Sequence, residues 1–193
     1  MRTLAAILLT SVLLTAVVHG QAEAIRPEYM TLSLDSTPRF PKVEGFNLEG
    51  RHFSLPNDFE GGLNIALVAF RREQQNDVDT WVPFLKSIAD KHAGLKAYEL
   101  PTLNASYRVV RGFIDGGMAR GIPEKATRET TITLYIDKTS FKETLGITTE
   151  DRIVTLLVSR NGRVLWRGDG RYTAEAAADL ASAIERLMPT GAP

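Results

Sequence analysis

Two kinds of hydrophobic pattern alternate along the chain. Short unbroken apolar runs are typical of strands buried on both faces, and apolar residues spaced every three or four positions are typical of helices packed on one side. The runs predict strands at 64–70, 95–100, 130–136 and 152–159. The three-to-four spacing predicts helices at 80–92, 105–120, 139–145 and after a capping Thr173.

Two tight turns add antiparallel hairpins to these elements. Residues 46–55 alternate between apolar and polar around Glu49-Gly50. Asn161-Gly162 separates the strand at 152–159 from a second apolar stretch at 163–166. Asn-Gly favours a hairpin turn because both residues adopt positive φ readily.

The order of elements predicts an α/β fold. Strands that alternate with helices form a parallel sheet with the helices on its faces, and the C-terminal antiparallel hairpin makes the sheet mixed. This domain is expected to cover residues 46–188. An extended, proline-containing lead-in is expected at 25–45, and a short tail at 189–193.

The first 24 residues have the pattern of a cleavable export signal. A basic start precedes Leu4 to Val18, a run without charge that is shorter than the roughly 20 residues of a comfortable membrane span. Small residues follow, so cleavage is expected after Gly20, Ala22 or Ala24. The mature protein would then be periplasmic or secreted from a bacterium, with no transmembrane span. An uncleaved membrane anchor is the alternative.

Composition excludes several classes of function. The chain has no cysteine, which rules out disulfides, thiolate catalysis and metal sites with cysteine ligands. The 23 basic and 23 acidic residues give zero net charge, which argues against nucleic-acid binding. His52 and His92 have no metal-type spacing partner, and no nucleotide-binding or serine-nucleophile motif occurs. We therefore predict no catalytic residue, no metal and no cofactor.

The element order resembles the thioredoxin-like superfamily, in its peroxiredoxin-like form. Phe70 at a strand end and Pro83 inside the following helix have the spacing of that superfamily's active-site motif. In this register Gln75 and Val78 take the places of the two cysteines, and Val154 takes the place of the cis-proline. Ala69 replaces the buried carboxylate of thioredoxins. The joint loss of these groups implies a redox-inactive protein.

The closing hairpin, residues 156–168, resembles that of ATP10-type factors, which assist assembly of the membrane sector of ATP synthase. This resemblance implies a protein-binding, assembly or chaperone-type module. Its partner would be an envelope or membrane-complex protein.

Two surfaces are candidate binding sites. Ligands favour the carboxyl end of a central strand in such sheets, where the loop with Arg71 and Arg72 is expected. In the thioredoxin-like register, Gln74 and Gln75 are expected at its rim, facing Val154 and Thr155. Arginines beside free helix N–H groups could also hold a small anion, so an enzyme or anion-binding protein is the alternative function.

The second candidate is Trp166 with Arg167, next to Arg163 on the hairpin. Tryptophan and arginine are common in the energetic centres of protein interfaces. Trp166 is either such an exposed anchor or a core residue, whereas Trp81 is expected in the core.

We predict that the exported protein begins between Gln21 and Ile25. N-terminal sequencing of the protein isolated from the cell envelope or medium checks this. A start at Met1 would instead indicate the anchored form.

Overall fold

The computed structural model describes residues 37–188. The predicted signal at 1–24, the first part of the lead-in and the tail at 189–193 lie outside the described residues. Within the described part, no helix is long and apolar enough to cross a membrane.

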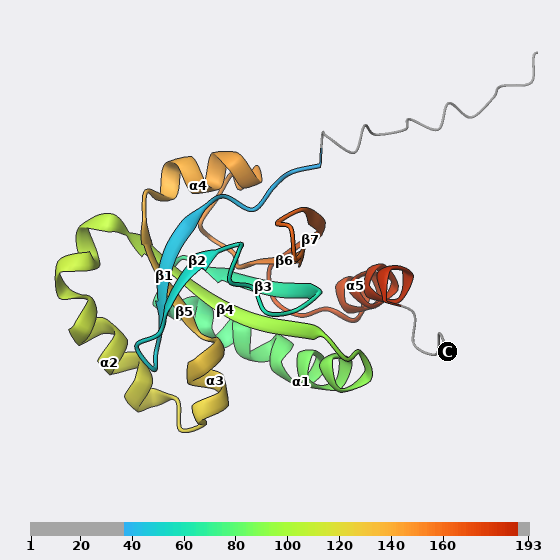
Figure 1. The fold of residues 1–193 in the computed structure, drawn as a ribbon, viewed down its shortest axis with the longest axis horizontal. Coiled ribbons are helices and arrows are strands. Elements are labelled where there is room, and N and C mark those ends of the chain that lie inside the picture. Colours follow the sequence, from blue (N-terminus) through green and yellow to red (C-terminus); the bar gives the residue numbers. More distant parts are fainter. Residues whose placement is uncertain (1–36, 189–193) are drawn as a thin grey trace, which may run out of the picture. The chain divides into compact units, whose positions relative to one another are not determined.

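A single seven-stranded mixed sheet organises the described chain (Figure 1). Its strands run in the order β2-β1-β5-β4-β3-β6-β7. Strands β3, β4 and β5 are parallel, whereas β6 and β7 on one side and β1 and β2 on the other are antiparallel. The strands are β1 (Val43–Asn47), β2 (His52–Leu55), β3 (Leu63–Ala69), β4 (Leu95–Asn104), β5 (Ile132–Ile136), β6 (Val154–Ser159) and β7 (Val164–Asp169). The predicted parallel core with a C-terminal antiparallel hairpin is confirmed.

Helices cover both faces of this sheet. On one face α1 and α5 enclose a core that includes Trp81 and Leu157. On the other face α4 packs with Phe40 and Phe59. The α-helices are α1 (Gln75–Lys91), α2 (Arg111–Gly121), α3 (Lys125–Thr130), α4 (Lys138–Leu145) and α5 (Ala174–Leu187), and the 3₁₀ turns are η1 (Arg72–Gln74) and η2 (Ala105–Val110).

The turn and capping residues expected from the sequence lie at the ends of these elements. Gly146 closes α4 in the left-handed conformation at φ 63°, which glycine adopts without steric cost. Gly162 has φ 83° in the Asn-Gly turn between β6 and β7. The Thr173 side chain accepts a hydrogen bond from the Ala176 N–H and caps α5.

Several boundaries differ from those expected from the sequence. Helix α1 begins at Gln75 instead of Thr80. The residues before Thr80 are polar except for the buried Val78, so they show no helical spacing of apolar residues in the sequence. Strand β4 continues through Pro101, which lies opposite Ala69 at the end of β3. On the other side of β4, Pro101 falls between the Glu99–Thr131 bridge and the β5 ladder that starts at Thr102, so the residue without an N–H lies at a gap in the pairing with β5.

The segment between β4 and β5 also differs from the single helix expected at 105–120. It forms η2 followed by α2, and the short helix α3 follows before β5. The clustered glycines at 112, 116, 117 and 121 all lie within α2, so they do not cause the change from η2 to α2, although each interior glycine costs about 1 kcal/mol relative to alanine.

The ordered domain begins earlier than the hairpin pattern indicated. Strand β1 starts at Val43, three residues before the expected start at Phe46. Before it, the Phe40 ring lies 5.4 Å from the ring of Phe59 and 5.8 Å from that of Phe141, measured between centroids. Phe40 is thus a core residue within the region expected to be a lead-in.

We expect Phe40→Ala to lower the free energy of unfolding by about 3–5 kcal/mol, the usual cost of removing a buried phenylalanine ring. Phe113→Ala, at an exposed position, is the matched control and should change it by less than about 0.5 kcal/mol. Urea unfolding measures both. Equal, small effects would show that Phe40 does not contribute to the core.

Candidate functional site

The loop between β3 and α1 lies at the carboxyl edge of the parallel strands. Strands β3, β4 and β5 end at Ala69, Asn104 and Ile136, and their parallel pairing places these ends along one edge of the sheet. Open α/β sheets bind ligands at this edge. The expected position of the Arg71-Arg72 loop is therefore confirmed.

Gln74 is not a rim residue, contrary to the prediction from the sequence. Its side chain is 5% exposed, and its Oε1 accepts hydrogen bonds from the backbone N–H of Phe70 at 2.7 Å and of Arg71 at 3.2 Å. Its Nε2 donates to the Glu150 carbonyl at 2.7 Å. The amide thus joins the loop after β3 to the connection between α4 and β6.

Two sets of ion pairs strengthen the same junction. An Arg71 Nη2 to Asp151 Oδ1 distance of 2.7 Å marks a salt bridge beside the Gln74 contact. The Glu150 carboxylate receives Lys138 at 2.6 Å and Lys142 at 2.8 Å, both from α4. Burial alone would raise the pKa of Glu150, but the hydrogen bonds and charges of these lysines hold it below its ordinary value. The β3–α1 loop, helix α4 and the connection between α4 and β6 therefore meet at Glu150.

Arg72 and Gln75 remain exposed on this surface. No described residue pairs with the Arg72 side chain. The Gln75 Nε2 donates to Asp79 Oδ1 at 3.0 Å, and both side chains lie beside the half-buried carboxyl of Glu99 on β4. Burial and the charge of Asp79 raise the pKa of Glu99, against the opposing hydrogen bond from Gln75.

Val154 and Thr155 do not form a rim opposite the loop, so that expectation is wrong. Both are buried inside the sheet, where β6 pairs them with Val68 and Leu67 of β3. The one cis peptide bond among the described residues precedes Pro56, so the Ile153–Val154 bond is trans, as expected. Strand β6 lies between β3 and β7, and Val154 packs in the core on one face of the sheet, so neither residue reaches the accessible surface.

The hairpin residues have structural roles. Trp166 is partly buried against the core under α1 and α5, which supports the core interpretation over an exposed anchor. Arg167 donates from Nη1 to the carbonyls of Leu145 at 3.0 Å and Gly146 at 2.9 Å, the free end of α4. A cation there also interacts favourably with the helix dipole.

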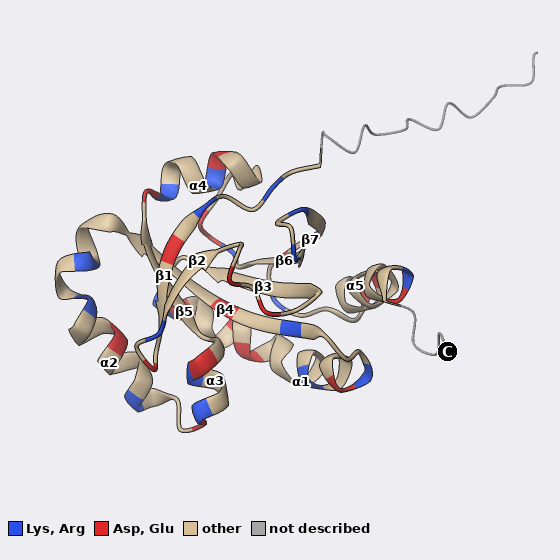
Figure 2. Cartoon of the chain, viewed as in Figure 1, with Lys and Arg blue, Asp and Glu red and all other residues tan. Residues whose placement is uncertain are grey.

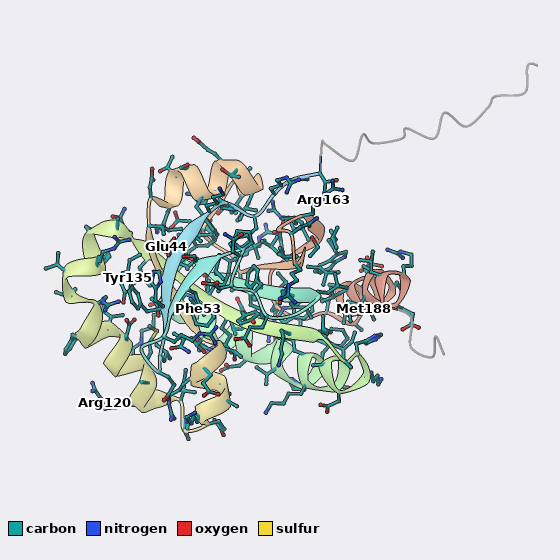
Figure 3. All side chains as sticks on the ribbon, viewed as in Figure 1. Glu44, Phe53, Arg120, Tyr135, Arg163 and Met188 are labelled. Atoms are coloured by element: carbon teal, nitrogen blue, oxygen red, sulfur yellow. The ribbon has the colours of Figure 1, made fainter. Side chains whose placement is uncertain are left out.

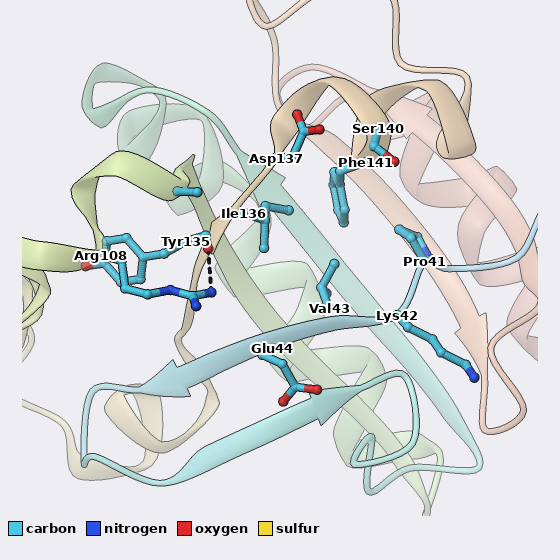
Figure 4. A pocket seen from close by; sticks show the side chains of 11 residues that line it. Pro41, Lys42, Val43, Glu44, Arg108, Tyr135, Ile136, Asp137, Ser140 and Phe141 are labelled. Carbon is cyan, nitrogen blue, oxygen red and sulfur yellow. Dashed lines mark hydrogen bonds between the residues drawn. The ribbon is translucent and has the colours of Figure 1, made fainter.

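A second feature of the carboxyl edge was not predicted from the sequence. A cleft of about 420 Å³ opens where β1 and β5 separate, lined by apolar Val43, Ile136 and Phe141. Figure 4 shows the Arg108 guanidinium at one side of this cleft, where its Nη2 donates to the Tyr135 carbonyl at 3.0 Å. Strand separation depends on tertiary packing, so no local pattern could indicate it.

The cleft and the loop are neighbours on this edge through α4. Lys138 at the start of α4 lies 6.0 Å from the Phe70 ring centroid, while Asp137, Ser140 and Phe141 line the cleft. We call the surface formed by Arg71, Arg72, Gln75, the start of α4 and the cleft the edge surface. Among residues 37–188, no group of acidic or histidine side chains is placed to hold a metal ion.

Comparisons with known proteins give a fold but no family. No family model and no curated protein matches the chain. A candidate electron transfer protein from Aquifex aeolicus aligns with a TM-score of 0.56 at 8% identity, covering 77% of this chain and 96% of that one. A member of the Sco family of cytochrome c oxidase assembly proteins aligns with a TM-score of 0.51 at 13% identity, covering 78% and 94%.

The thioredoxin domain of a thiol-disulfide oxidoreductase from Bacteroides vulgatus aligns with a TM-score of 0.50 at 18% identity, covering 79% of this chain and 98% of that domain. The chain has a thioredoxin-like fold. Phe70 directly after β3 and Pro83 within α1 occupy the places that the sequence register gave them. In that register Gln75 is exposed and Val78 is buried, and the chain has no cysteine to take either position.

We expect Glu99→Gln to raise the melting temperature at pH 7, because a carboxyl with a raised pKa destabilises the fold once it is charged. The gain should fade as the pH drops through the folded pKa and vanish below the ordinary value of 4.5, where the carboxyl is protonated in both states. Glu73→Gln, an exposed site with the same charge change, is the control. A gain for Glu99→Gln that is constant from pH 4 to 8 would contradict the burial of this charge.

Proposed function

We propose that this chain is an exported, redox-inactive thioredoxin-like protein that binds a polypeptide partner through the edge surface. The observation that carries the proposal is the Gln74 amide, which joins the β3–α1 loop to Glu150. A loop fixed in this way loses little further freedom when a partner binds, and such preorganisation favours affinity.

The chemistry of the loop favours binding over catalysis. The positions equivalent to thiols hold Gln75 and Val78, neither of which is a nucleophile. Arg72 is exposed and can make bidentate hydrogen bonds to a carboxylate of a partner. The neighbouring cleft, lined by both apolar and polar side chains, offers a recess for a side chain of that partner.

The narrower role proposed here is that of an assembly factor for an envelope or membrane complex. The resemblance of residues 156–168 to the hairpin of ATP10-type factors supports it. One protein of similar fold belongs to a family of cytochrome c oxidase assembly proteins, so this fold is compatible with a role in assembling a membrane complex. The export signal proposed for residues 1–24 would deliver the protein to the envelope.

Anion binding at the Arg71-Arg72 loop is the second candidate function. The unpaired Arg72 beside the start of α1 favours it. Asp151 opposes it, because this carboxylate already occupies Arg71. Inorganic phosphate that raises the melting temperature by mass action would support this candidate.

We expect Arg71→Ala with Arg72→Ala to weaken capture of an envelope protein about tenfold or more, since one charge-assisted hydrogen bond contributes about 1.5–3 kcal/mol. The fold should survive, because the exposed Arg71–Asp151 pair contributes about 0–1 kcal/mol. Quantitative pull-down from solubilised envelopes, with partners identified by mass spectrometry, measures the effect.

The matched control is Arg160→Ala with Arg186→Ala. These exposed arginines lie at the other end of the sheet and on α5. Arg167 is unsuitable because it caps α4. Equal losses in both double variants would point to non-specific charge attraction, and no loss in either would place the binding face elsewhere.

A further inference from the structure

The segment between β4 and β5 is an unusual part of the described surface. From Asn104 to Thr130 no side chain is buried. Four of the six large hydrophobic residues that are exposed among residues 37–188 lie here, with exposed fractions of 52% for Tyr107, 92% for Val109, 49% for Val110 and 82% for Phe113. The described chain leaves Val109 and Phe113 almost bare and Tyr107 and Val110 half covered, so this segment presents an apolar surface without a partner among residues 37–188.

This segment is also cationic, although the whole chain is neutral. Residues 105–121 contain Arg108, Arg111 and Arg120 against the single acid Asp115, a net charge of +2. Figure 2 shows blue stretches along η2 and α2 on both sides of one red stretch. The Tyr135 hydroxyl donates to Asp115 Oδ1 at 2.8 Å, which holds that carboxylate toward the domain.

Contacts within the domain also fix the base of the segment. The Arg111 guanidinium lies 3.7 Å from the Phe46 ring centroid, and Arg108 binds the Tyr135 carbonyl. Arg120, labelled in Figure 3, projects outward at the far end of α2. Arg108 and Arg111 thus hold the segment against β1 and β5, while Arg120 stays outside these contacts.

The shape of this surface indicates whether it binds a protein partner or a membrane. Val109 and Phe113 protrude almost fully, and a side chain built at Gly112 or Gly117 would meet nothing within 4 Å. In Figure 1 α2 lies outside the sheet, beyond β1. Protein partners are usually anchored in pockets between well-packed residues. Protruding apolar side chains on a cationic segment instead suit the boundary between lipid headgroups and acyl chains.

From this combination we propose that residues 105–121, which we call the docking segment, bind the surface of a membrane containing anionic lipids. Tyr107, Val109, Val110 and Phe113 enter the headgroup boundary. Arg120 is free to approach the anionic headgroups, and Arg108 and Arg111 add positive charge at the base of the segment, which the negative surface potential attracts. The docking segment shares Ala105 and Arg108 with the cleft of the edge surface, but its exposed apolar side chains do not line that cleft, so the inference stands apart from the proposed partner.

The test places an indole at the tip of the docking segment in the full chain. Phe113→Trp is compared with Leu187→Trp on α5, another exposed apolar position. Both variants keep the N-terminal apolar run, so anchoring through that run affects both alike. The fluorescence of the unsubstituted chain, which comes from Trp81 and Trp166, is subtracted from that of each variant. The vesicles are phosphatidylcholine with or without phosphatidylglycerol, with brominated acyl chains that quench inserted indoles.

With phosphatidylglycerol present, the indole at position 113 should shift its emission to the blue and be quenched, while the indole at 187 should not. Absence of quenching at 113 would overturn the proposal. Equal quenching at 113 in pure phosphatidylcholine would overturn the role of anionic lipid. A blue shift without vesicles that grows with protein concentration, together with a dimer in sedimentation, would assign the surface to a second copy and overturn the proposal as well.

Discussion

The hydrogen bond from the Gln74 side chain to the Glu150 carbonyl supports the rest of the proposed edge surface. It joins segments 76 residues apart, and the same amide fixes the backbone N–H groups of Phe70 and Arg71. Because Gln74 is buried, leaving these groups unpaired would cost about 1–3 kcal/mol each. Arg71, Arg72 and Gln75 are presented in a fixed arrangement because this junction holds the loop between them and β3.

Local pattern was sufficient to predict most of the fold. The continuous apolar runs of β3 and β6 need no knowledge of their partners to be recognised, and Asn161-Gly162 specifies its own turn. Pro83 is the more informative residue, because a proline inside a helix is locally unfavourable. Its spacing from Phe70 fixed the register in which β3, the loop and α1 correspond to those of a thioredoxin-like sheet.

The details of the candidate site depended on contacts that a local pattern does not contain. Gln74 and Gln75 are chemically identical neighbours in a polar run, yet the first is buried and the second is exposed. Gln74 caps the backbone of Phe70 and Arg71 and reaches the Glu150 carbonyl, whereas Gln75 bonds to the exposed Asp79. The apolar run at 152–159 already indicated that Val154 is buried, and only the thioredoxin-like register had suggested an accessible rim there. Phe40 could be judged a core residue only after Phe59 and Phe141 were in place. Such residues are specified by the tertiary structure.

Amide hydrogen exchange at Phe70 and Arg71 tests most directly whether the loop is held as described. In the native protein these two amides should be protected to nearly the same degree as those of β3, since both donate to the buried Gln74 Oε1. In Gln74→Ala they should exchange rapidly, while β3 keeps its protection. Rapid exchange at both positions in the native protein would contradict the account, because the edge surface would then not be preorganised.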